Sequence, residues 1–268
     1  MTGTDLDRKE KRLMEEIGSR GSLLVAFSGG VDSSLLAAVA REVLGDRCRG
    51  VLLESPLVPR QAVREARETA AALGIPLDVI PVPLMEEEAF TGNPPDRCSL
   101  CKRISARVLK ERAREIGLAH VADGTSTSDL GEHRPGIRAG REEGILHPFL
   151  EAGCTKEDIR AMARRRGLGS WNRPSAACLA SRIPYGEGIT GARLRMIEEA
   201  EEVLRELGFG QARVRHHGPV ARIEVMPGEM ERLWRERERI LGRLRSIGFS
   251  YVTADLAGYR SGSMDEVL

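Results

Sequence analysis

The stretch that decides the fold is SGGVDSS at residues 28–34, which directly follows an apolar run at residues 23–27. The apolar run predicts a strand, and the two glycines with their neighbouring hydroxyl residues predict a tight turn. The helical pattern over about 33–44 predicts a helix after that turn. Gly29 and Gly30 let the backbone turn sharply and come close to a ligand. The helix would direct its unpaired N–H groups and the positive end of its dipole at that ligand. The sequence therefore predicts a phosphate-binding loop.

Side chains of the same loop add polar groups for such a ligand. Ser28, Ser33 and Ser34 offer hydroxyl donors, and Asp32 offers a carboxylate for a magnesium-bound pyrophosphate. The loop is not a Walker loop, because G-x-x-x-x-G-K-[ST] and its Lys are absent, and it contains no G-x-G-x-x-G dinucleotide fingerprint. It is similar to the pyrophosphate loop of the N-type ATP pyrophosphatases. That resemblance implies ATP binding and adenylylation of a carboxylate or carbonyl oxygen.

Length and composition limit the class of protein. A chain of 268 residues can form one large domain or a domain with a small appendage. Its 41 basic and 40 acidic residues give a net charge of +1, which counts against nucleic acid as the main partner. The first residues lack an apolar signal core and no run approaches membrane-spanning length, so we expect a cytoplasmic protein with no membrane partner. Five cysteines in such an enzyme favour metal binding or catalysis over disulfides.

Strands and helices alternate through the first two thirds of the chain. Apolar runs predict buried strands at 23–27, 49–53, 77–82 and 118–122, with helices at about 33–44, 60–73 and 102–116. This alternation predicts an α/β fold with a doubly wound parallel sheet, whose ligand lies at the carboxyl ends of the strands. Asp123 and Gly124 follow the last of these strands and would face the same crevice as the phosphate loop. Residues 125–148, poor in apolar side chains, are expected to form a long loop over the site.

The pattern changes near residue 187. The sequence after this point predicts a helix over about 191–207, alternating segments at 212–216 and 220–225, a charged helix over about 228–246 and a strand near 249–255. We therefore expect two domains, residues 1–187 and residues 188–268. The second would be a small α+β domain that binds substrate or forms contacts in a homo-oligomer.

Three cysteines are candidates for a metal site. Cys98 and Cys101 form a C-x-x-C, and Cys178 lies far downstream. A lone C-x-x-C is compatible with zinc, a redox dithiol or an iron–sulfur site. Zinc needs four ligands, and the fourth would be a residue such as Cys154 or His147. Three thiolates suit a [4Fe–4S] cluster with one open iron, and spacing alone leaves these alternatives open.

Several blocks along the chain together resemble one family. The blocks are SGGVDSS, DGT (123–125), RPGIRA (134–139), CLASRIPYGE (178–187), RVRHH (213–217), ARIEV (221–225) and GYRSGSM (258–264). In this combination the sequence resembles the LarE family of ATP-dependent sulfur transferases, which make the nickel-pincer nucleotide cofactor of lactate racemase. The resemblance spans essentially the whole chain, and CLASRIPYGE and GYRSGSM are its most specific blocks.

The resemblance implies a reaction and a set of cofactors. In that family ATP adenylylates a carboxylate of pyridinium-3,5-biscarboxylic acid mononucleotide, and a sulfur nucleophile displaces AMP. Two rounds give the bisthiocarboxylate. Cys178 looks like the catalytic cysteine, which in single-cysteine members gives up its own sulfur and becomes dehydroalanine. With Cys98 and Cys101 the chain looks like the three-cysteine members, which implies a [4Fe–4S] cluster beside ATP and magnesium, with zinc as the lesser alternative.

The implied substrate is a small anionic molecule, so its site needs cations. Arg213 and Arg215 are two apart on an expected strand and share a face. The residues expected to bind substrate are Arg182, Arg213, Arg215, Arg222, Glu224 and Arg260. His216 and His217 are adjacent on the same strand and would point to opposite faces, which argues against a joint metal site. The alternative function is tRNA thiolation by an enzyme of the same superfamily, which the near-neutral charge disfavours.

Overall fold

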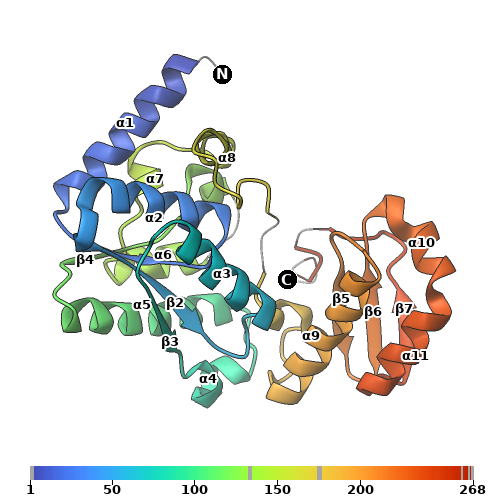
Figure 1. The fold of residues 1–268 in the computed structure, drawn as a ribbon. Helices are drawn as coiled ribbons and strands as arrows, with labels where there is room; N and C mark the ends of the chain where they lie inside the picture. The colour runs from blue at the N-terminus through green and yellow to red at the C-terminus, as the bar shows by residue number, and fades with distance from the viewer. Residues whose placement is uncertain (1–2, 132–134, 174–176, 261, 265, 267–268) are drawn as a thin grey trace. The chain divides into compact units, whose positions relative to one another are not determined.

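The computed structural model describes residues 3–131, 135–173, 177–260, 262–264 and 266 (Figure 1). Its contacts divide the chain into two compact units. The first unit comprises Met1–Ser55, Arg60–Leu84 and Asp96–Ala176, and the second comprises Pro56–Pro59, Met85–Pro95 and Ala177–Leu268. The domain boundary expected after residue 187 stays a prediction. No helix in the described part of the chain is long and apolar enough to cross a membrane.

The first unit is built on a parallel sheet with the strand order β3-β2-β1-β4. The strands are β1 (Leu23–Ala26), β2 (Cys48–Glu54), β3 (Leu77–Pro81) and β4 (His120–Ala122). Leu24 at the centre of the sheet pairs with Arg49 on one side and with Val121 on the other. All four strands lie where the apolar runs predict them, and the predicted α/β parallel sheet is confirmed.

Helices cover both faces of this sheet. They are α1 (Gly3–Ser19), α2 (Val31–Leu44), α3 (Arg60–Ala72), α5 (Arg97–Glu115), α6 (Pro135–Glu142), α7 (Pro148–Glu151) and α8 (Lys156–Arg165). Right-handed crossovers place α2 and α3 on one face, and the return from β3 across the sheet to β4 places α5 on the other (Figure 1). Leu24, Val51 and Val121 accordingly pack with the buried residues of α5. The connections on either side of β1 thus run over opposite faces, which puts the topological switch point between β1 and β4.

The segment 125–148 is more ordered than the sequence suggests. Its described residues include a short 3-10 helix, η3 (Thr127–Gly131), and α6, so the prediction of one long loop is wrong; residues 132–134 lie outside the described residues. Gly140 explains the difference, because a Cβ there would lie 3.0 Å from Cε of Lys102 on α5. Glycine lowers intrinsic helix propensity, but here it allows α6 to approach α5 closely.

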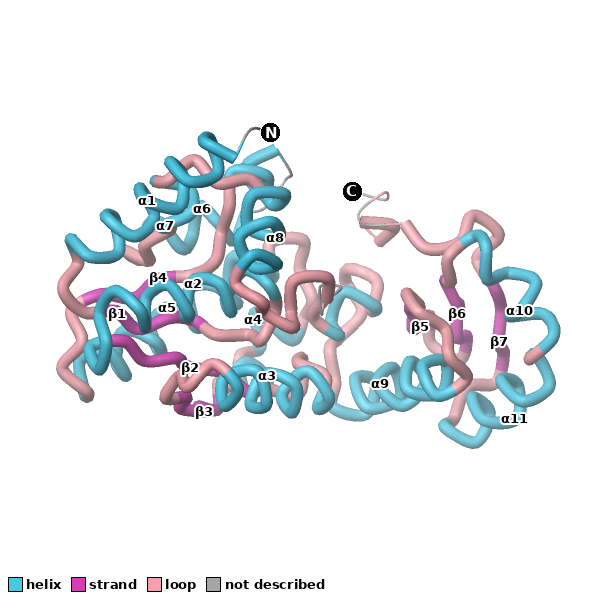
Figure 2. Tube along the Cα trace, turned by 45° about the horizontal axis from the view of Figure 1, so that its top comes forward, coloured by secondary structure: helices cyan, strands magenta, loops and turns pink. Residues whose placement is uncertain are grey.

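The second unit contains a three-stranded mixed sheet with the order β5-β6-β7. β5 (Arg213–His217) runs antiparallel to β6 (Val220–Glu224), which is parallel to β7 (Tyr251–Ala254). Its helices are α4 (Glu88–Thr91), α9 (Gly191–Glu206), α10 (Met230–Arg235) and α11 (Arg237–Ile247) (Figure 2). The single helix expected over 228–246 is therefore two helices, α10 and α11.

One face of this second sheet is apolar and the other is charged. Val214, Ala221 and Ile223 are buried in one hydrophobic cluster with residues of α9 and α11. Because side chains alternate along a strand, the neighbouring residues of β5 and β6 project from the opposite face. That face carries Arg213, Arg215, Arg222 and Glu224, which are four of the six residues that the sequence predicts as substrate ligands.

Candidate active site

The SGGVDSS stretch forms a tight turn at the carboxyl end of β1. Gly29 has φ +73°, a left-handed conformation, and a Cβ there would lie 2.6 Å from Cα of Ala66. Ser33 Oγ accepts a hydrogen bond from the N–H of Ser28 (3.1 Å) and donates to the carbonyl of Gly30 (3.2 Å). α2 begins at Val31, two residues earlier than predicted, so the whole turn faces a helix N-terminus. This geometry suits a polyphosphate.

Asp32 occupies the first turn of α2 and is paired with a lysine from a distant segment. Lys156, the first residue of α8, forms an ion pair with Asp32 Oδ2. Asp32 Oδ1 and Ser34 Oγ are buried and have no hydrogen-bond partner in the described part of the chain. Unpartnered buried oxygens are costly, and they are the groups that a bound cation or phosphate would satisfy.

Asp123 and Gly124 lie beside this turn, as the switch-point argument predicts. A Cβ on Gly124 would lie 2.8 Å from Cβ of Asp32, so the end of β4 touches the start of α2. Asp123 Oδ1 is 2.7 Å from Nδ1 of His147, and Oδ2 pairs with Lys102. Burial would raise the pKa of Asp123, but the hydrogen bond with His147 and the charge of Lys102 lower that pKa below its usual range. Asp123 is therefore held as a carboxylate.

Two cations that no sequence motif indicates lie beside the turn. Lys156 reaches Asp32 over 124 residues of sequence. Arg173 donates to the carbonyl of Gly29 (3.2 Å) and to Oγ1 of Thr69 (3.3 Å). Neither residue belongs to a local motif that binds phosphate, so only the tertiary structure reveals them.

Cys98 and Cys101 lie in the first turns of α5. They are three residues apart on a helix and therefore share a face. Cys98 is exposed and Cys101 is partly exposed, and none of the five cysteines, all of which lie in the described part of the chain, forms a disulfide. Cys48 and Cys154 are buried, and burial raises the pKa of each thiol to about 11. Those two thiols stay protonated at neutral pH, which makes Cys154 a poor fourth ligand.

Cys178 belongs to the second unit and is exposed, directly before the 3-10 helix η4 (Leu179–Arg182). Arg182 is 2% exposed and donates from Nη1 to the carbonyls of Ala177 (3.1 Å) and Cys178 (2.9 Å). Its other guanidinium nitrogens form two hydrogen bonds with Glu201 of α9, at 2.8 and 3.0 Å. Arg182 therefore holds the backbone around Cys178 with its charge already neutralised.

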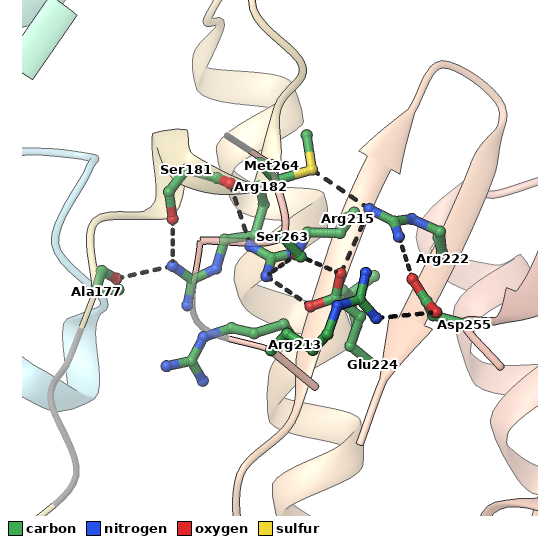
Figure 3. A network of polar contacts seen from close by, with 12 residues as sticks. Ala177, Ser181, Arg182, Arg213, Arg215, Arg222, Glu224, Asp255, Ser263 and Met264 are labelled. Atoms are coloured by element: carbon green, nitrogen blue, oxygen red, sulfur yellow. Dashed lines mark hydrogen bonds and ion pairs between the residues drawn. The ribbon is translucent and has the colours of Figure 1, made fainter. Parts of the chain in front are cut away.

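The charged face of the second sheet is centred on a buried ion pair (Figure 3). Arg215 Nη2 donates to Glu224 Oε2 (2.6 Å) and to Ser263 Oγ (3.0 Å), and Ser263 Oγ donates to Glu224 Oε1 (2.8 Å). Glu224 is 0% exposed. Arg215 Nη1 also donates to the carbonyl of Ser181 (3.2 Å), so the ion pair also touches the segment after Cys178.

The remaining predicted ligands differ in their partners. Arg222 pairs with Asp255 and lies 3.4 Å from Glu224 Oε1, and Arg260 pairs with Glu266. Arg213 has no carboxylate partner in the described part of the chain; its guanidinium lies 5.5 Å from the ring centre of Tyr259. Burial and then the charge of Arg182 lower the pKa of Arg213. The charge of Glu201 acts in the opposite direction, but among the described residues Arg213 forms no ion pair of its own.

The two histidines of β5 point to opposite faces, as predicted. His216 packs against Phe249 with ring centres 5.6 Å apart, and His217 accepts a hydrogen bond from Nε of Arg222 (3.2 Å). Burial lowers the pKa of both. The described residues contain no group of three His, Cys, Asp or Glu side chains arranged to hold a metal. Cys98 and Cys101 belong to one unit and Cys178 to the other, so their joint site stays a prediction.

Comparison with known proteins gives two kinds of match. The family model for NAD synthase matches residues 7–128, which contain the phosphate loop. The chain is 36% identical to an uncharacterised protein of Synechocystis sp. over 98% of this chain and 99% of that protein. It is 34% identical to the pyridinium-3,5-bisthiocarboxylic acid mononucleotide synthase of Lactiplantibacillus plantarum, over 98% of this chain and 96% of that protein. A GMP synthase of Aeropyrum pernix is 29% identical, over 68% of this chain and 39% of that protein.

Proposed function

Because the chain belongs to the LarE family of ATP-dependent PP-loop enzymes, we propose that it inserts sulfur into pyridinium-3,5-biscarboxylic acid mononucleotide through an acyl-adenylate. The product would be the bisthiocarboxylic acid mononucleotide. The observation that carries the proposal is the similarity to the Lactiplantibacillus plantarum synthase over nearly the full length of both chains. The turn at Gly29, facing the N-terminus of α2, supports the ATP-dependent step.

In the first step a substrate carboxylate oxygen attacks the α-phosphorus of ATP and pyrophosphate leaves. Residues of the turn would bind that pyrophosphate through main-chain N–H groups and through the hydroxyls of Ser28, Ser33 and Ser34. We assign Asp32 to magnesium, since one of its oxygens is buried without a partner. Lys156, which now neutralises Asp32, would then be free to contact a phosphate oxygen.

The carbonyl carbon of the acyl-adenylate is then attacked by sulfur, and AMP leaves. A carboxylate does not react in this way, because its leaving group would be oxide; adenylylation replaces oxide by AMP. We assign sulfur delivery to Cys178, with Cys98 and Cys101. These three thiols are at least partly accessible, whereas Cys48 and Cys154 are buried and protonated. The donor set fits a [4Fe–4S] cluster held by three cysteines, which would supply a replaceable sulfide.

Arg213 is the residue that we assign most directly to the anionic substrate. It is the cation of the charged face without a carboxylate partner among the described residues, and a forked guanidinium suits phosphate. Arg182 and Arg215 are neutralised by Glu201 and Glu224. They would shape the site and contact the substrate through any donor that their carboxylates leave free, with Arg222 and Arg260 at its border.

Protein purified under anaerobic conditions tests how sulfur is delivered. The proposal expects brown protein with about four irons per chain. C98A, C101A and C178A should each lose the colour and multiple turnover. C48A is the matched control, because Cys48 is 1% exposed and its thiol is protonated. Colourless protein whose Cys178 becomes dehydroalanine after one transfer would contradict the cluster and leave the sulfur insertion itself standing.

A further inference from the structure

Asn93 joins two segments that are distant in sequence and that lead to the candidate cysteines. It is 0% exposed and is the only non-glycine residue with a positive φ (+58°) in the described part of the chain. Such a conformation costs about 1–2 kcal/mol for most L-residues, and asparagine adopts it where its short polar side chain can form local hydrogen bonds. The conformation of Asn93 therefore has a reason in the contacts of its side chain.

The contacts of Asn93 give that reason. Its Nδ2 lies within hydrogen-bond distance of three main-chain carbonyls, those of Ile183 (3.3 Å), Pro184 (2.7 Å) and Glu187 (3.0 Å). Its own carbonyl accepts a hydrogen bond from the N–H of Gly186 (3.0 Å). One amide thus holds a turn of the CLASRIPYGE block that has no regular secondary structure of its own.

A second contact continues the same junction. The N–H of Ile189 donates to the carbonyl of Thr91 (2.7 Å), so residues 91–93 and 183–189 are held together along their length. Both segments belong to the second unit. We call this set of contacts the Asn93 junction.

The position of the Asn93 junction along the chain connects it to the chemistry. Ile183 is five residues after Cys178, and Arg182 between them fixes the carbonyl of Cys178 itself (2.9 Å). Cys98 is five residues after Asn93 in the other direction, where the chain leads into α5. The Asn93 junction therefore restrains the backbone that follows Cys178.

We propose that Asn93 is a positioning residue for sulfur delivery: its side-chain amide fixes the turn that follows Cys178 and thereby the segment that carries this thiol. This inference rests on the proposed function. Residues that orient ligands without binding the reacting group commonly change metal affinity when they are replaced. Asn93 is not assigned to ATP binding, so its effect should be confined to the sulfur step.

Two variants separate the backbone role of Asn93 from its side-chain role. N93G accepts φ +58° without strain and removes only the amide. N93D keeps the shape but replaces the donors by a carboxylate facing three carbonyls, so it should be the more severe change. N172G, at an exposed asparagine, is the matched control.

The experiment measures iron loss to a chelator, pyrophosphate release and thermal stability for each variant. N93G should lose iron roughly tenfold faster than the wild type, at the lower end for residues that orient ligands. Its pyrophosphate release should match that of the wild type, and N172G should match it in every readout. A folded N93G protein that keeps its iron like the wild type would overturn the proposal, and so would an equal loss of pyrophosphate release.

If the wild-type protein contains no iron, the cluster is contradicted, but the role of Asn93 can still be tested. The readout is then the rate of the single sulfur transfer from Cys178 at saturating substrate. N93G should lower that rate roughly tenfold with an unchanged KM for ATP. An unchanged transfer rate would show that the Asn93 junction has no positioning role.

Discussion

Replacing Arg213 and Arg215 separately by alanine distinguishes a substrate ligand from a residue that holds the fold. The two arginines share a face of β5, and their sequence contexts are alike. Their surroundings differ, because Arg215 is 5% exposed and paired with Glu224 at 2.6 Å, whereas Arg213 has no carboxylate partner among the described residues.

The expected magnitudes follow from these surroundings. R213A should lose a charge-assisted hydrogen bond to the substrate, about 1.5–3 kcal/mol, which corresponds to a roughly 10–150-fold weaker binding of the mononucleotide. Its thermal stability should change little. R215A leaves Glu224 buried without its closest cation, and breaking such a pair costs about 3–5 kcal/mol of folding free energy. At roughly 2–4 °C per kcal/mol, the Tm should fall by roughly 6–20 °C.

The assay combines calorimetric binding of the mononucleotide with thermal unfolding of both variants. The double variant R215M/E224L removes both charges and should recover much of the stability lost in R215A. ATP affinity should not change in R213A, since the residue lies outside the phosphate loop. A Tm in R215A equal to that of the wild type, or equal weakening of ATP and mononucleotide binding in R213A, would refute this reasoning.

Three further predictions concern the first unit. K156A should raise the KM for ATP at least tenfold in a pyrophosphate-release assay, because Asp32 loses its cation and the phosphates lose a charged contact; an unchanged KM would exclude Lys156 from the ATP site. G29A should abolish ATP binding in calorimetry, because its side chain would lie 2.6 Å from a backbone atom of α3. The control is G45A, at φ +58° with open space around it, which should lose only about 1–2 kcal/mol of stability and still bind ATP. Burial would raise the pKa of Asp158, but the hydrogen bonds that it accepts lower that pKa below its usual value. The contribution of Asp158 to stability is therefore present above about pH 4 and is lost as the pH falls. Unfolding measured between pH 6 and 3 should show a smaller loss of stability for D158N than for the wild type.

The sequence was sufficient for those parts of the fold that depend on local patterns. Short apolar runs separated by helical periodicity predicted β1 to β4 and the helices between them, and alternation predicted that Arg213 and Arg215 share a face of β5. The turn at Gly29 was predictable because only a residue without a Cβ fits φ +73° against α3. In each case the determining interaction lies within a few residues of the pattern.

The parts that could not be predicted depend on contacts between distant residues. Lys156 begins α8 with a capping box, and nothing in that pattern indicates that its side chain reaches Asp32. From the sequence the arginines of the second unit are equivalent cations, because it does not reveal that Glu201 neutralises Arg182 while Arg213 has no ion pair among the described residues. α6 was missed because its glycines lower helix propensity while permitting close packing.

The most direct test of the central claim is the mass of the product formed anaerobically from ATP and pyridinium-3,5-biscarboxylic acid mononucleotide with a sulfide source. The proposed reaction gives a product in which sulfur replaces oxygen, first in one carboxylate and then in both, with one AMP and one pyrophosphate released for each exchange. D32N should release neither. AMP and pyrophosphate released with no sulfur in the product, or sulfur incorporated without consumption of ATP, would contradict the claim.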